Sequence, residues 1–97
     1  MSKNRTQKYK PIHPGEVLQE ALHGADLSQS ALAKHIGVSQ SKINDSCRGR
    51  RGISLEMAAR LGQAFGMSME FWYNLQKQYE LDSFDRSDYG KIGTIAA

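Results

Sequence analysis

The stretch from residue 27 to residue 52, LSQSALAKHIGVSQSKINDSCRGRRG, limits the possible folds of this chain more than any other segment. Ser28 is expected to cap a short helix, and Gly37 to supply a tight turn, because glycine tolerates left-handed backbone angles. Ser39 is then expected to cap a second short helix. The three residues from Gly37 to Ser39 form a connection as short as a helix-turn-helix requires. The segment therefore predicts this motif within a helical domain.

The second of these two helices is expected to expose hydrogen-bonding side chains of the kinds that read base edges in a major groove. The base-reading candidates are Gln40, Ser41, Asn44 and Arg48. Other polar or basic residues stand at the helix starts and in the loop that follows, and phosphate groups require such donors and positive charge. The phosphate-binding candidates are Ser28, Gln29, Ser39, Lys42, Arg50 and Arg51. The residues therefore predict sequence-specific binding to double-stranded DNA.

The rest of the chain predicts an all-α fold of five helices. A helix is expected to start at His13-Pro14 and to end at Gly24, because proline suits a first helical turn and glycine a helix end. Two more helices are expected after the motif, the first capped by Ser54 and closed by Gly66, and the second capped by Ser68. The inward-facing residues expected in the first of these are Leu55, Ala58, Ala59, Leu61 and Phe65. Residues 92–97 suit a short strand or coil.

The chain length and the charge distribution predict a single domain with two tails. The 97 residues, 39% of them hydrophobic, are enough for one small core. We expect a flexible basic arm at residues 1–11, the helix-turn-helix domain at residues 12–81 and a C-terminal tail at residues 82–97. The front of the chain is basic, whereas acidic residues outnumber basic ones after Phe71. This asymmetry is typical of a DNA-facing surface opposite a solvated or protein-facing one.

Several other functions are not expected. The single cysteine, Cys47, cannot form an intrachain disulfide, and the three histidines lack the spacing of metal ligands. His35, Asp45 and Ser46 are the residue types of a catalytic triad, but they lie on two short helices without a nucleophile elbow. We therefore expect no enzyme activity, no metal and no cofactor. No apolar run is long enough to span a membrane, so the cytoplasm is the default location.

Five segments together resemble the HigA-type antitoxins, which belong to the Cro/C1-type (XRE) helix-turn-helix repressors. Beside the helix-turn-helix they are HPGEVLQEAL, INDSCRGRRGIS, AARLGQAFG and EFWYNLQKQYELD, and the resemblance covers about residues 12 to 82. It implies a dimeric protein that binds the operator of its own operon and represses it. It also implies a protein partner, a ribosome-dependent mRNA endonuclease toxin of the HigB type, which the antitoxin neutralises. Two recognition helices of a dimer would enter successive major grooves of a palindromic operator, about 34–36 Å apart.

The resemblance also bears on two groups of residues. The apolar stripe of the last helix is expected to pack on the domain or, if partly exposed, to form the dimer interface. It consists of Phe71, Trp72, Leu75 and Tyr79. At Ser46 and Cys47 the family usually has apolar residues. A buried Ser46 hydroxyl is expected to bond to a nearby carbonyl, such as that of Lys42.

Two alternatives remain open at this point. A stand-alone repressor of the same family, without a toxin, would lack a short, basic toxin-sized reading frame beside its own. A protein-interaction module with this fold would lack the basic surface of the second motif helix, which this sequence retains.

Overall fold

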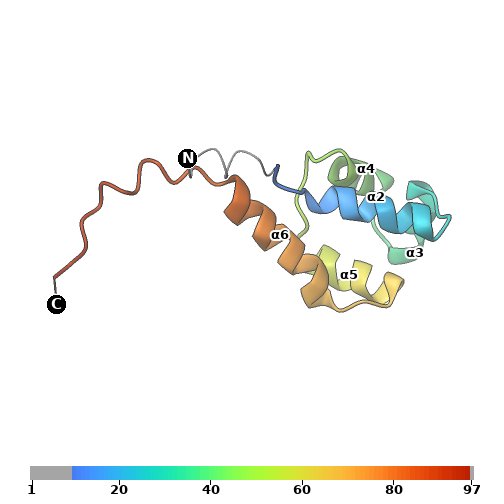
Figure 1. Ribbon diagram of the computed structural model, residues 1–97. Coiled ribbons are helices and arrows are strands. Elements are labelled where there is room, and N and C mark those ends of the chain that lie inside the picture. Colours follow the sequence, from blue (N-terminus) through green and yellow to red (C-terminus); the bar gives the residue numbers. More distant parts are fainter. Residues whose placement is uncertain (1–9, 97) are drawn as a thin grey trace.

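The computed structural model describes residues 10–96, in which five helices follow one another and no strand occurs (Figure 1). The helices are α2 (Pro14–Gly24), α3 (Gln29–Ile36), α4 (Gln40–Cys47), α5 (Leu55–Phe65) and α6 (Met69–Ser83). The all-α, five-helix prediction is confirmed. Residues 92–96 are coil, so the strand alternative for them is wrong. Residues 1–9 of the predicted basic arm lie outside the described residues. Helix α6 runs two residues past the predicted domain end at 81, and the domain boundaries stay a prediction.

The start of every helix lies where the sequence predicts it. Four serine hydroxyl oxygens each accept a hydrogen bond from the backbone N–H three residues later, at 3.0 to 3.2 Å; they belong to Ser28, Ser39, Ser54 and Ser68. Helix α2 is capped by His13, whose Nδ1 accepts from the Gly15 N–H at 2.9 Å. Such caps satisfy backbone donors that have no partner inside the helix. These side-chain bonds therefore fix the boundaries of short helices.

The ends of the helices agree with the predictions except for one detail. Gly37 and Gly66 have the left-handed backbone conformation, with φ of 75° and 69°, and they close α3 and α5 as expected. Helix α2 ends at Gly24, but the left-handed residue in this turn is Asp26, with φ of 53°. The helical conformation continues to Ala25, whose N–H still bonds to the Ala21 carbonyl. The chain therefore changes direction at Asp26 and not at Gly24.

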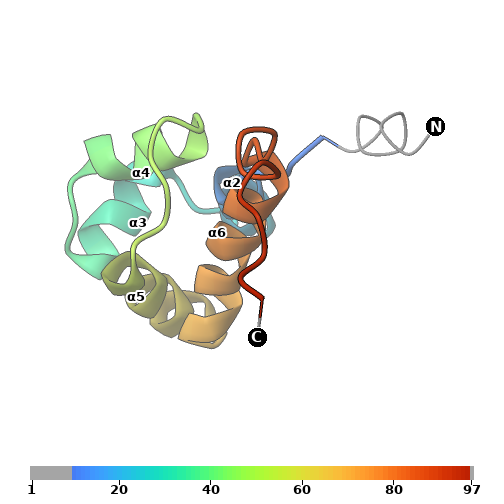
Figure 2. The same ribbon diagram turned by 90° about the vertical axis from the view of Figure 1, so that its left-hand side faces the viewer.

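The helices form two groups (Figures 1 and 2). Helices α2, α3 and α4 lie together, and α4 contacts both of the others. Helices α5 and α6 pack against each other in the most extensive contact between elements, and they join the first group where α6 meets α2 and α5 meets α3. The segment after α6 leads away from the helices (Figure 1). One core unites both groups; its buried apolar residues are Leu18, Leu22, Leu32, Ala33, Ile36, Ile43, Cys47, Ile53, Met57, Ala58, Leu61 and Trp72.

The inward face of α5 differs in part from the prediction. Ala58 and Leu61 are buried and Phe65 is half-buried, as expected. Leu55 and Ala59 are exposed, however, so the prediction is wrong for these two residues, and the buried Met57 was not predicted. The reason is the packing of α5 against the chain that leads into α6. The two segments are close at Gly62, where a Cβ would lie 2.6 Å from the Met67 carbonyl oxygen.

Candidate nucleic-acid interface

Helix α4 separates the molecule's core from a polar surface. Its inner side consists of Ile43, Ser46 and Cys47, all of which are buried. Among the base-reading candidates, Gln40, Ser41 and Arg48 are exposed and Asn44 is half-buried. The helix thus buries one side and presents hydrogen-bonding side chains on the rest of its surface, as a helix that enters a groove must.

The position of α4 is set by backbone contact with α2. A Cβ atom at Gly15 would overlap the carbonyl oxygen of Ser46, so the two helices approach as closely as glycine permits. Gln19 of α2 adds a hydrogen bond from Nε2 to the Cys47 carbonyl oxygen at 2.6 Å. These contacts hold the C-terminal end of α4 on α2, and no flexible side chain lies between the backbones at Gly15.

The predicted hydrogen bond of Ser46 is wrong. Ser46 is fully buried, as expected, but within residues 10–96 its hydroxyl has no hydrogen-bond partner, so it is not bonded to the Lys42 carbonyl. A buried hydroxyl without a partner costs free energy, so we expect its removal to stabilise the domain.

A hydrogen bond joins the two helices of the motif. The Nδ2 atom of Asn44 in α4 donates to Oε1 of Gln29 in α3 at 3.1 Å. Asn44 is a base-reading candidate and Gln29 a phosphate-binding candidate, so the structure brings one member of each set together. The sequence contains no signal for this pairing, because the two residues lie 15 positions apart on separate helices. The bond orients the Asn44 amide before any ligand is present.

The two serine caps of the motif leave donors available at the surface. Ser28 and Ser39 are exposed, and their oxygens accept from the N–H groups of Ala31 and Lys42. A hydroxyl that accepts a bond through its oxygen can still donate its own hydrogen. The N–H groups of the first helical turns also lack partners inside the helix. The starts of α3 and α4 can therefore donate hydrogen bonds to an anion such as a phosphate group.

The basic loop after α4 is tied to that helix. The backbone N–H groups of Arg50 and Arg51 both donate to the Asp45 carbonyl oxygen, at 2.8 and 3.3 Å. Gly49 enables this turn with a left-handed φ of 77°. Both arginine side chains are exposed. Arg51 and Lys42 line one small hollow of about 80 Å³ at the junction of this loop with α5. The structure thus brings these two phosphate-binding candidates together.

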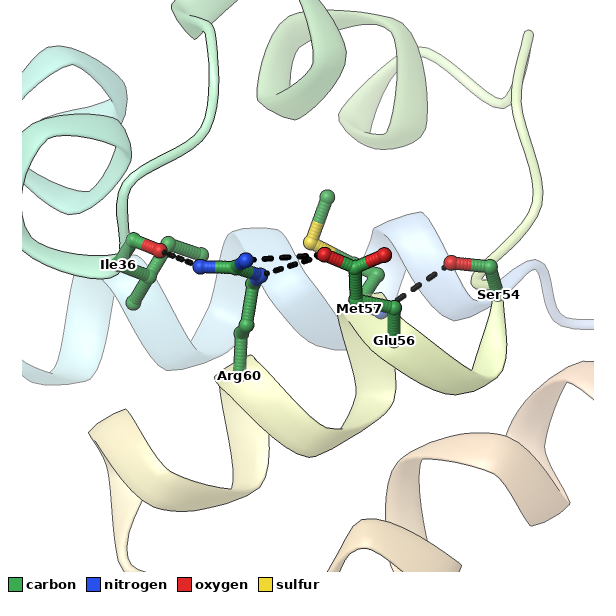
Figure 3. Close-up of polar contacts among 5 residues, drawn as sticks. All are labelled: Ile36, Ser54, Glu56, Met57 and Arg60. Carbon is green, nitrogen blue, oxygen red and sulfur yellow. Dashed lines mark hydrogen bonds and ion pairs between the residues drawn. The ribbon is translucent and has the colours of Figure 1, made fainter.

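Arg60 is a residue that the sequence reasoning missed. Its guanidinium donates to the carbonyl oxygen of Ile36 at 2.5 Å and to the Glu56 carboxylate at 2.9 and 3.2 Å (Figure 3). It therefore connects α5 to the last residue of α3, directly before the turn of the motif. The pair Glu56–Arg60, four residues apart on one helix, was the available signal for an ion pair. Arg60 therefore stabilises the motif through its bond to Ile36. Because Glu56 neutralises its charge, we do not count it among the cations of the DNA-facing surface.

The aromatic stripe of α6 contains one completely buried residue and three half-buried ones. Trp72 is completely buried and packs edge-on against Phe71, with ring centroids 5.4 Å apart. Its side chain therefore packs within the domain, as the packing interpretation expects, and the dimer interface stays a prediction. Phe71, Leu75 and Tyr79 are half-buried. Tyr79 also packs edge-on against the ring of His13, at 4.7 Å between centroids.

Burial shifts the pKa values of two titratable groups near the interface. Desolvation lowers the pKa of His13, although the nearby Glu16 carboxylate opposes this shift. Burial raises the pKa of the Cys47 thiol, which keeps it protonated and unreactive. Among residues 10–96, no group of three or more potential metal ligands occurs. The same residues include no helix that is long and apolar enough to cross a membrane.

Comparison with known proteins agrees with this architecture. The family model described as "Helix-turn-helix domain" matches residues 15–70. Virulence-associated protein I of Dichelobacter nodosus is 46% identical over 71 residues, which are 72% of this chain and 66% of that protein. A Pseudomonas aeruginosa protein solved with its 18-bp operator DNA is 42% identical, has a TM-score of 0.80 and matches over 89% of this chain and 98% of its own.

A further solved structure is Pseudomonas aeruginosa antitoxin HigA with the higBA promoter. It is 47% identical with a TM-score of 0.77, and the match covers 84% of this chain and 89% of that one. The family is one of helix-turn-helix DNA-binding antitoxins and regulators. The chain belongs to the HigA-type antitoxins of the helix-turn-helix family.

Proposed function

We propose that this protein binds double-stranded DNA sequence-specifically, as a homodimer on a palindromic operator, and represses the operon that encodes it. The observation that carries the proposal is the outer surface of α4, on which Gln40, Ser41 and Arg48 are exposed while the opposite side is buried. A rigid helix with such a surface fits the width of the major groove. The relatives solved with operator or promoter DNA support the same assignment.

Base recognition is assigned to four residues of α4 and its C-cap, Gln40, Ser41, Asn44 and Arg48. Side-chain amides pair with adenine edges and guanidinium groups with guanine edges, so Gln40 and Asn44 suit adenine and Arg48 suits guanine. The bond that the Asn44 amide donates to Gln29 holds this amide in one orientation. This bond uses one donor of the Asn44 amide and leaves its oxygen and a second donor for a base.

Phosphate binding is assigned to residues at the edges of the motif. The hydroxyls of Ser28 and Ser39 and the amide of Gln29 supply neutral donors at the helix starts. Lys42, Arg50 and Arg51 supply positive charge. Such contacts fix the register of the protein on DNA without reading the sequence, and they make binding strongly dependent on salt.

Dimerisation is assigned to Phe71, Leu75 and Tyr79, the half-buried apolar residues of α6. A dimer with two-fold symmetry would place two α4 helices in successive major grooves, about 34–36 Å apart. The second subunit would add an equal set of DNA contacts, so it would supply much of the total affinity.

As an antitoxin, the protein is further proposed to bind a HigB-type mRNA endonuclease. The relative solved as antitoxin HigA supports this assignment. The exposed acidic residues Glu80, Asp82, Asp85 and Asp88 offer charge complementary to a basic toxin. The location that follows for such a regulator is the cytoplasm, where its operator and the ribosome-dependent toxin both occur.

The DNA proposal is tested by a mobility-shift titration on a duplex from upstream of the coding region, with excess random competitor and two salt concentrations. A competitor-resistant shift at dimer stoichiometry is expected. Arg48→Ala should reduce discrimination between the two DNAs, whereas Arg51→Ala should weaken both and lower the salt slope by about one. Arg86→Ala, which removes one charge from the segment after α6, is the control and should bind as the wild type does. Unchanged discrimination by Arg48→Ala would contradict its base-reading role.

The toxin proposal is tested separately by co-expression with the neighbouring reading frame. A stable complex and rescue of growth are expected when that frame encodes a short, basic endonuclease. Specific DNA binding without such a partner would instead identify a stand-alone repressor.

A further inference from the structure

The buried amide of Gln76 on α6 reaches the loop that carries Arg50 and Arg51. Gln76 is only 9% exposed, and its Oε1 accepts a hydrogen bond from the Ile53 backbone N–H at 2.8 Å. This bond spans 23 positions in the sequence and joins α6 to the segment between α4 and α5. That segment runs from the upper helices to α5 (Figure 2). The bond therefore anchors the downstream end of the basic loop.

Glu80 determines which way the Gln76 amide points. The Nε2 atom of Gln76 donates to Oε2 of Glu80 at 3.0 Å. An ionised carboxylate only accepts hydrogen bonds, so it selects the NH2 side of the amide. The amide oxygen is then directed at the Ile53 N–H, which needs an acceptor. The two bonds thus fix a single amide orientation.

Gly52 brings the loop backbone onto this amide. A Cβ at Gly52 would lie 2.7 to 2.9 Å from three atoms of the Gln76 amide group, so a larger residue here would displace the amide. Upstream, the Asp45 carbonyl oxygen already holds the N–H groups of Arg50 and Arg51. The two arginines therefore stand between an anchor on α4 and an anchor on α6.

We propose that Gln76 is a positioning residue for DNA binding, which orders the Arg50–Arg51 loop in advance of phosphate contact, with Glu80 orienting its amide. The inference rests on the proposed DNA-binding function. A loop that is ordered before binding loses less conformational freedom on DNA, so the affinity of its cations increases. Leu75 and Tyr79 lie next to Gln76 and Glu80 on α6. One side chain therefore connects the helix assigned to dimerisation with the surface assigned to DNA.

The test compares Gln76→Met with Gln78→Met in the full chain. Gln78 is the matched control, because it also donates to a carboxylate four residues later, Asp82 at 2.8 Å, but it is exposed and makes no hydrogen bond to the loop. The probes are a duplex from upstream of the coding region and a random duplex of equal length. Gln76→Met should weaken binding to both about tenfold and reduce the salt slope by about one. Gln78→Met should bind like the wild type with unchanged oligomeric state.

Two further variants keep the test decisive if Gln76→Met does not fold. Glu80→Ala alters an exposed residue and should weaken both duplexes about threefold, because the amide can then rotate. The exchanged pair Gln76→Glu with Glu80→Gln keeps the net charge, the acceptor for the Ile53 N–H and a bond between the two side chains. It should restore most of the binding that Gln76→Glu alone loses.

Amide hydrogen exchange distinguishes the possible results. Faster exchange at Ile53 in Gln76→Met or Glu80→Ala, with weaker binding and a lower salt slope, supports the proposal. Faster exchange with unchanged binding overturns it, as does equal weakening by Gln78→Met or no gain from the exchanged pair. If the wild type itself binds neither duplex, the proposed DNA function fails and this inference fails with it.

Discussion

The α3–α4 unit and the α5–α6 pair are stabilised in different ways. Helices α5 and α6 make the most extensive contact in the fold, and Ala58, Leu61 and Trp72 are completely buried. Helices α3 and α4 have only eight residues each. They contribute Leu32 and Ile43 to the same core, and single bonds add to this packing: two serine caps, Asn44 to Gln29, and Arg60 to Ile36. Helices this short have little stability alone. The comparison teaches that the recognition unit keeps its outer surface free for DNA because its neighbours supply its stability.

The largest expected effect comes from breaking the α5–α6 pair. Trp72→Ala should lower the free energy of unfolding by about 3–5 kcal/mol, because it empties a fully buried site. Urea unfolding followed by circular dichroism measures this change, and the signals of all helices should disappear in one transition. Leu55→Ala is the control, since this side chain is 53% exposed and should alter stability by less than about 0.5 kcal/mol. If α3 and α4 remained helical after α5 and α6 had unfolded, the stability of α3 and α4 would not depend on their neighbours.

The bond between the two motif helices can be tested through DNA affinity. Asn44→Ala should weaken binding to the operator by about 1–3 kcal/mol if Asn44 reads a base. Gln29→Ala should reproduce part of this loss, because the Asn44 amide then loses its orientation. A double-mutant cycle measured by fluorescence anisotropy should show a coupling of about 0.5–1 kcal/mol. Strict additivity would show that the two side chains act independently on DNA.

Removal of the Ser46 hydroxyl is expected to raise the stability of the domain rather than lower it. Ser46→Ala should raise the free energy of unfolding by about 1 kcal/mol, because it removes a buried polar group without a partner among residues 10–96. Thermal unfolding measures the effect. Ser41→Ala, at an exposed position on the same helix, should change stability little. A loss of stability in Ser46→Ala would mean that the hydroxyl is bonded in solution.

The smallest expected effect is a change in how the free energy of unfolding depends on pH. Burial lowers the pKa of His13 in the folded protein, so the unfolded chain binds more protons in the range between the two pKa values. The free energy of unfolding should therefore fall as the pH drops from about 7.5 to about 5.5. His13→Asn should retain a helix cap but lose this part of the pH dependence. Urea midpoints at the two pH values, compared between wild type and variant, provide the measurement. Equal pH dependence in both proteins would assign the effect to other groups.

Sequence predicted the local features of this fold well. The four serine caps and the glycine turns at Gly37 and Gly66 depend on neighbouring residues, so they are visible in the sequence. The rotation of α5 was only partly predictable. The exposed Leu55 and the buried Met57 depend on how α5 packs against α3 and α6, which are distant in the sequence.

The candidate interface was predictable as a set of residues but not as a connected arrangement. The bonds from Asn44 to Gln29 and from Ile53 to Gln76 join residues 15 and 23 positions apart, and no periodicity indicates them. The unpaired hydroxyl of Ser46 was likewise hidden, because its surroundings depend on how separate helices pack around α4. The base and phosphate contacts themselves stay predictions that the DNA experiments decide.

The close approach of Gly15 to Ser46 has a consequence for how such repressors diverge. Backbone atoms, not adjustable side chains, hold α4 against α2 at this point. Mutations at Gln40, Ser41 or Arg48 therefore alter the outer surface without shifting the axis of the helix. Natural selection can exchange those residues to acquire a new operator while the framework beneath them remains unchanged. Duplicated copies of such a gene could in this way gain separate regulatory targets through a few substitutions.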